Sequence, residues 1–116
     1  MAATTTVQNI LDAAWQILKD PSGALFYPAA DMYRWVNEGV EQIRQARPEC
    51  QITSAGALIT ITPVTALVDV ISIDDRHYTA ILEWVLYRAF GADAEDAGDL
   101  KQAAAHQAAF DRALGR

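Results

Sequence analysis

Cysteine, basic side chains and long apolar runs are all scarce in this chain of 116 residues. The single cysteine, Cys50, has no second cysteine with which it could form an internal disulfide. No apolar run approaches the roughly 20 residues that a bilayer-spanning helix needs, so we expect a soluble protein. The first six residues lack the basic region and the apolar stretch of a secretory signal, so we expect no such leader.

The charge balance is acidic, with nine Lys and Arg residues against fifteen Asp and Glu residues and a net charge of −6. The basic residues stand singly along the chain instead of forming a run. A protein that holds DNA without sequence preference needs a basic face that displaces counterions from the phosphates. We therefore expect no appreciable affinity for duplex DNA at physiological salt. A helix-turn-helix regulator would in addition need a basic recognition helix, and none of the helices expected from this sequence is basic.

Residues that carry catalysis or bind metals occur in no recognised arrangement. His77 and His106 lie far apart in the sequence, with no further cysteine or histidine at the spacing of a zinc site. The chain has neither a nucleophile-elbow serine nor a glycine-rich nucleotide cradle. One acidic cluster lacks the closing glutamate of a calcium loop and is better explained as a solvated helix end: Asp93, Glu95, Asp96 and Asp99. We expect no enzyme activity, no cofactor and no metal site.

Apolar periodicity predicts a mainly helical fold, a small four-helix bundle with a short β-hairpin or ribbon in the middle, as a single domain over 1–116. The expected helices span 7–19, 28–47, 76–97 and 99–114, and the β-like segment spans 51–73. Threonines 4–6 offer a cap for the first helix, and Asp99 offers one for the fourth. Small residues on the fourth helix predict an antiparallel hairpin with the third. Two strands alone are marginal in water, so the ribbon should pack on the helices or on a neighbouring subunit.

The large apolar residues on these helical faces form the expected core, whose members are Trp15, Leu18, Trp35, Ile43, Leu82, Val85, Leu86 and Phe90. Gly39 lies inside the second helix, where glycine costs roughly 1 kcal/mol relative to alanine. This position predicts the close approach of another backbone.

Two blocks of the sequence resemble the head-to-tail adaptor, or connector, proteins of tailed bacteriophages. The C-terminal block consists of Ala80–Phe90, the acidic Asp93–Glu95, the alanines of 103–105 and the Ala-Phe pair at 109–110, and it closes with a Leu-Gly pair at 114–115. The N-terminal block consists of Met32–Gly39 and the Arg-Pro pair at 47–48. The resemblance covers roughly residues 5–50 and 64–115. The chain departs from the family in its shorter β-rich middle.

This resemblance implies a structural protein of the virion without catalytic activity. Such adaptors form a ring, commonly of twelve copies, between the portal and the tail, and the ring extends the DNA channel. The implied partners are the portal protein, tail or nozzle proteins and further copies of the chain, while genomic DNA passes without specific binding and no membrane is contacted. The implied location is the virion neck, after assembly in the host cytoplasm. A small helical interaction or regulatory module without catalytic activity remains the alternative.

The candidate for the portal or subunit interface is the C-terminal end, with Phe110, Arg112, Leu114 and Arg116. An apolar pair beside two cations at a helix end supplies both an anchor and charge complementarity. The alternative is that Phe110 and Leu114 pack back on the first and third helices. If the end is not the contact, the segment 51–73 is the next candidate.

Overall fold

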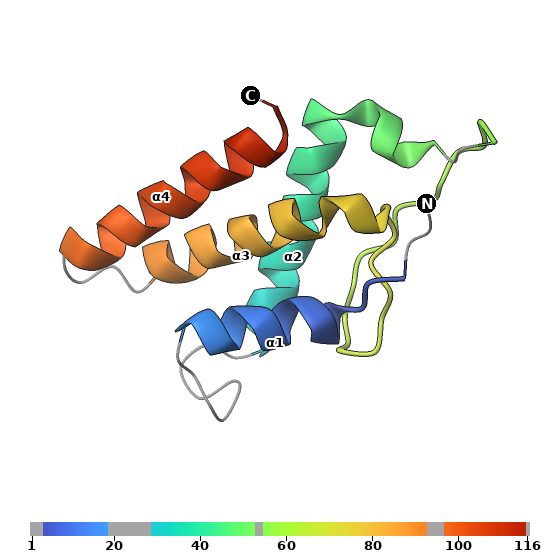
Figure 1. Ribbon diagram of the computed structural model, residues 1–116. Coiled ribbons are helices and arrows are strands. Elements are labelled where there is room, and N and C mark those ends of the chain that lie inside the picture. The colour runs from blue at the N-terminus through green and yellow to red at the C-terminus, as the bar shows by residue number, and fades with distance from the viewer. Residues whose placement is uncertain (1–3, 19–28, 53–54, 93–96, 116) are drawn as a thin grey trace.

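The computed structural model describes residues 4–18, 29–52, 55–92 and 97–115, and this part of the chain contains four α-helices and no strand. The helices are α1 (Val7–Leu18), α2 (Ala29–Ala46), α3 (Tyr78–Ala92) and α4 (Ala97–Ala113), with short 3-10 turns at Pro48–Gln51 and Asp75–His77 (Figure 1). The mainly helical prediction is therefore confirmed. The third helix ends earlier than the expected residue 97, and residues 93–96 lie outside the described residues. The fourth helix begins at Ala97, so Asp99 lies in its first turn and is not the residue before it.

The helix α3 lies at the centre of the fold and packs against each of the other three helices. In Figure 1, α1, α3 and α4 lie side by side in one layer, and α2 crosses behind α3. The chain direction reverses between α3 and α4, which form the antiparallel hairpin that the small residues of α4 predict. The molecule is correspondingly flat, measuring 47 × 31 × 17 Å along its principal axes.

The core lies between α1, α2 and α3, where the apolar stripes of the three helices meet. Of the residues expected there, five are buried: Trp15, Trp35, Ile43, Val85 and Leu86. The other three, Leu18, Leu82 and Phe90, are partly buried and pack at the margin of the core. The sequence pattern misses a contribution from the middle segment, because Val64, Ile71 and Ile73 are at most 3% exposed.

The expected β-hairpin is not present in the described part of 51–73. Only isolated β-bridges occur there, Ile52 with Leu58 and Thr6 with Val70, both antiparallel. The segment 67–71 pairs with the N-terminus instead, through hydrogen bonds from the amides of residues 7 and 8 to the carbonyls of 69 and 67, at 3.0 and 2.9 Å. Pro63 has no amide hydrogen to donate to a paired strand, and the carboxylate of Asp69 accepts the amides of residues 65 and 66, closing a turn. The described residues of 51–73 therefore do not show the hairpin, whereas the expected packing on the helices is found.

Asp75 ties the N-terminus to the start of α3. Its carboxylate accepts the amide hydrogens of Thr4 and Thr5 at 2.7 and 2.8 Å, and both threonine hydroxyls as well. These donors stabilise the charged carboxylate, so they lower the pKa of Asp75 far below its ordinary value. Thr6 then caps α1 as expected, because its hydroxyl accepts the amide of Asn9 while the Asn9 side chain accepts the amide of Thr6.

Replacing Asp75 by Asn should destabilise the protein in a pH-dependent way. A carboxylate whose pKa is lower in the folded state stabilises that state above its unfolded pKa, and the effect is lost as the pH falls through the folded value. We expect Asp75→Asn to lower the urea midpoint at pH 7 and the difference from wild type to shrink below about pH 4. Asp12→Asn, at an exposed carboxylate on α1, is the control. An Asp75→Asn deficit that does not change between pH 7 and pH 2 would contradict this assignment.

Candidate functional site

Of the residues expected at a C-terminal interface, the structure describes Phe110, Arg112 and Leu114, and two of these three are buried. Phe110 is fully buried and Leu114 is 2% exposed, and for Phe110 the alternative of packing back on the third helix is found. The ring of Phe110 lies against that of Trp84 on α3, with centroids 5.0 Å apart. Arg112 is exposed, and Arg116 lies outside the described residues. A portal contact at this end stays a prediction, and among the described members of the set only Arg112 has an exposed side chain to make it.

The end of α4 is held in place by Arg47, at the end of α2. The Arg47 guanidinium donates two hydrogen bonds to the carbonyl oxygen of Leu114, from Nε at 2.9 Å and from a terminal nitrogen at 2.6 Å. Gly115 follows with a φ of +78°, and a Cβ there would lie 2.5 Å from the guanidinium. The positive φ is the reason for glycine here, and a Cβ would also displace the end of the flexible Arg47 side chain. No local sequence signal could have identified this contact between residues so far apart in the chain.

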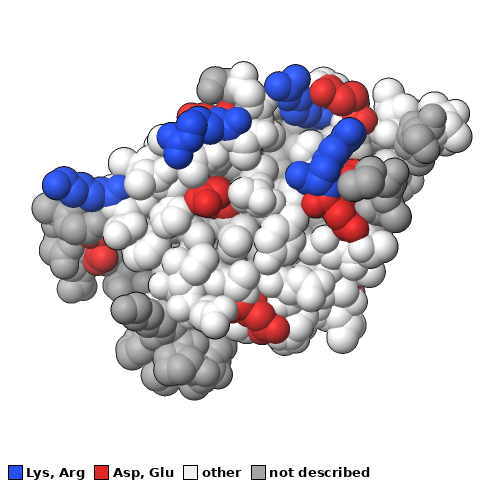
Figure 2. Space-filling view, in the orientation of Figure 1, with Lys and Arg blue, Asp and Glu red and all other residues white. Residues whose placement is uncertain are grey.

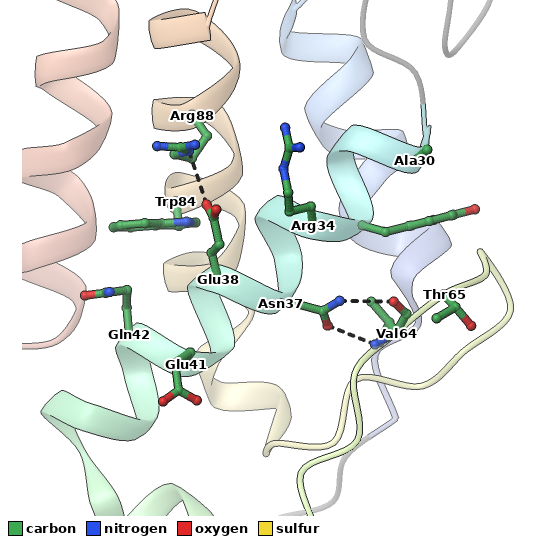
Figure 3. Close-up of a pocket in the computed structure, with 11 residues that line it drawn as sticks. Ala30, Arg34, Asn37, Glu38, Glu41, Gln42, Val64, Thr65, Trp84 and Arg88 are labelled. Carbon is green, nitrogen blue, oxygen red and sulfur yellow. Dashed lines mark hydrogen bonds and ion pairs between the residues drawn. The ribbon is translucent and has the colours of Figure 1, made fainter.

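An open groove runs along α2, with α3 on one side and residues Val64 and Thr65 on the other (Figure 3). Its cavity has a volume of about 840 Å³. Trp84 lines it and packs closely on α2, because a Cβ placed on Gly39 would lie 3.2 Å from Cδ1 of the indole. The close approach predicted at Gly39 is therefore made by a side chain and not by another backbone. The groove itself was not anticipated from the sequence.

The far wall of the groove is fixed to α2 by Asn37. Its side-chain amide donates to the carbonyl of Val64 at 3.1 Å, and its oxygen accepts the amide of Val64 at 2.8 Å (Figure 3). The Asn37 side chain thus bonds both main-chain groups of Val64, as a neighbouring strand would, and it holds the middle segment beside the helix. The groove therefore has walls on both sides that belong to the folded subunit.

Each charged side chain that lines this groove has a neighbour of opposite sign. Arg88 lies 3.2 Å from the carboxylate of Glu38, as the dashed line in Figure 3 shows. Arg34 pairs with Asp31 at 3.7 Å, and Glu41 accepts a bidentate contact from its neighbour Arg44. Exposed pairs of this kind add little stability, but they leave the groove without a surplus charge of either sign.

A second surface feature is apolar and comes from the middle segment. Leu58 and Val68 are 83% and 82% exposed, and Ile52 and Val70 are about half exposed. We call these four residues the 52–70 apolar surface. The basic side chains, in contrast, are separated by white or red surface on the face shown in Figure 2, so they form no continuous basic patch there. We therefore take the two most exposed of these side chains, Leu58 and Val68, as candidate contact residues.

The titratable residues singled out in the sequence form no reactive arrangement in the described parts of the chain. Burial, together with the neighbouring Glu49, raises the pKa of the Cys50 thiol, which disfavours the reactive thiolate. Burial lowers the pKa of His77. His106 instead joins α4 to α3, since its Nδ1 lies 2.5 Å from a carboxylate oxygen of Glu83 and its ring stacks on Phe90. No group of three or more metal-ligating side chains is found among the residues that the structure describes.

Two substitutions in α4 separate the buried face of its C-terminal end from the exposed one. Phe110→Ala should lower the free energy of unfolding by about 3–5 kcal/mol, because it leaves a cavity against Trp84. Arg112→Ala should change it by less than about 0.5 kcal/mol and should weaken binding to a portal protein if this end makes that contact. Urea denaturation and a pull-down with portal measure the two effects. A fully stable Phe110→Ala variant would contradict the packing, and unchanged portal binding by Arg112→Ala would contradict the contact.

Comparison with known proteins gives one match, and it falls on the half of the chain that contains α3 and α4. The family model described as SU10 adaptor protein matches residues 58–116, just over half of the chain. No curated protein and no solved structure matches the sequence. None of the described helices is both long enough and apolar enough to cross a bilayer. The resemblance to phage adaptors is thus confirmed for the C-terminal half, and the chain belongs to the SU10 adaptor protein family.

Proposed function

We propose that this protein is the head-to-tail adaptor of a tailed-phage virion, and that it forms a ring of twelve copies between the portal and the tail. The observation that carries the proposal is the family match over 58–116. In this role the protein is a structural component without catalytic activity. Its partners are the portal protein, tail proteins and copies of itself, and its location is the virion neck.

The surface of the subunit supports a role in assembly. Four large apolar side chains of the middle segment are about half exposed or more, which is costly for a protein that acts alone. Most of the described residues of α4 are exposed, because this helix packs chiefly against α3. A ring provides partners for such surfaces, since every subunit then has two neighbours.

The acidic charge balance suits a channel through which DNA passes without being held. With a net charge of −6, the subunit gains little from releasing the counterions of DNA. Negative charge on a channel wall repels the phosphates and favours sliding over retention. DNA is therefore the cargo of the proposed channel and not a ligand of the subunit.

The proposal is tested by the size of the protein alone and in the presence of its portal protein. We expect light scattering to show twelve copies of the 12.7 kDa subunit, either as a ring of the protein alone or as that mass added to the mass of portal, and electron microscopy to show a ring with a central channel. Albumin in place of portal is the control. A strict monomer that ignores portal would contradict the adaptor role and favour a small helical interaction module.

A further inference from the structure

We propose that the 52–70 apolar surface of one subunit docks into the α2–α3 groove of a second copy of this chain. The proposal rests on the proposed function in assuming that copies assemble, and it adds which two surfaces meet. Both surfaces are present on every subunit and differ from one another. A contact of this heterologous kind repeats from one copy to the next and closes into a ring when its rotation allows.

The docking segment is apolar and uncharged over an unusual length. From Gln51 to Val68 the sequence contains no Asp, Glu, Lys or Arg, although 21% of the chain is charged. Leu58 and Val68 are more than four-fifths exposed within this stretch. The single acid that follows, Asp69, is already engaged by the amides of residues 65 and 66. The segment therefore offers apolar contact area without a charge that docking would have to desolvate.

The backbone of the same segment is only partly used within the subunit. Between residues 58 and 62, the amide of Ile59 donates to the carbonyl of Gln51 at 2.6 Å, and the amide of Thr62 donates to the hydroxyl of Ser72 at 3.0 Å. The amides of Leu58, Thr60 and Ile61 donate to no group in the described parts of the chain. An extended stretch with unused main-chain groups is suited to docking against another chain.

The groove is the complementary surface on the neighbouring copy. Its lining includes the aromatic side chains of Tyr33 and Trp84 and the aliphatic Val64, which suit an apolar occupant. Its charged residues are compensated in pairs, so an uncharged segment meets no unbalanced charge. Gln42 and Arg34 also line it and place side-chain donors where the main-chain carbonyls of an extended segment can accept them. A cavity of about 840 Å³ accommodates several side chains.

A subunit cannot make this contact with itself. Asn37 pins the middle segment at Val64, where the segment forms the wall of its own groove. The part of the chain around residues 55–58, green in Figure 1, projects from the body at the side opposite the start of α4. Copies that assemble in a ring meet at a high local concentration. A symmetric dimer in which two grooves face each other would leave the projecting segment of both subunits exposed. A second copy is therefore the occupant.

Cross-linking of two single-cysteine variants tests the pairing directly. Leu58→Cys and Gln42→Cys subunits are prepared separately, mixed under assembly conditions with portal present, and treated with a short bismaleimide. The native Cys50 is 1% exposed and stays protected in the folded subunit. We expect a covalent dimer that joins the two variants, identified by mass spectrometry. Cross-links that join only two Leu58→Cys subunits, or no cross-links at all, would overturn the proposal.

A charge substitution with a matched control tests whether the contact contributes to assembly. Leu58→Asp should leave the thermal midpoint unchanged, because this side chain is 83% exposed, and should raise the concentration for half-assembly by at least about tenfold. Ile17→Asp, at a 47% exposed isoleucine on α1, should assemble like wild type. Normal rings from Leu58→Asp would overturn this contact and leave the adaptor role intact. A wild type that forms no ring with portal would instead overturn both.

Discussion

The structure depends on the burial of α3, which packs against each of the other three described helices. Its buried positions include Ile81, Val85, Leu86 and Ala89, and its Trp84 meets Phe110 of α4. A short helix that is apolar on several sides is stable in water only when neighbours cover those sides. The remaining elements are arranged around this requirement, and the flat shape of the subunit follows from it.

Covering α3 leaves other surfaces open, and those surfaces carry the proposed function. The helix α4 is held by its hairpin contact, by the pairing of His106 with Glu83 and by Arg47 at its last turn, so most of its outer face remains exposed. The middle segment contributes Val64, Ile71 and Ile73 to the core but leaves Leu58 and Val68 in water. The proposed assembly of copies would bury the apolar surface that a single subunit leaves in water.

The sequence predicted the helices well, because their apolar residues recur with the helical period and are followed by clear stop signals. It failed for 51–73, since β-branched residues favour an extended backbone without specifying its pairing partner. That partner is the N-terminus, which is held by Asp75 from a distant part of the chain. The burial of Phe110 was left open for a similar reason, because an alanine-rich helix gives a weak apolar stripe. The groove depends on Gly39, Trp84 and Val64 from three separate segments, and no local pattern contains it.

The central claim is that the surfaces left open by the fold are completed by neighbouring copies. Hydrogen exchange, measured by mass spectrometry on assembled rings and on dilute free subunits, tests it most directly. The account predicts that the amides of Leu58, Thr60 and Ile61, which donate to no group in the described parts of the chain, exchange much more slowly in the ring. Equal exchange of this segment in both samples, with new protection confined to other surfaces, would contradict the account.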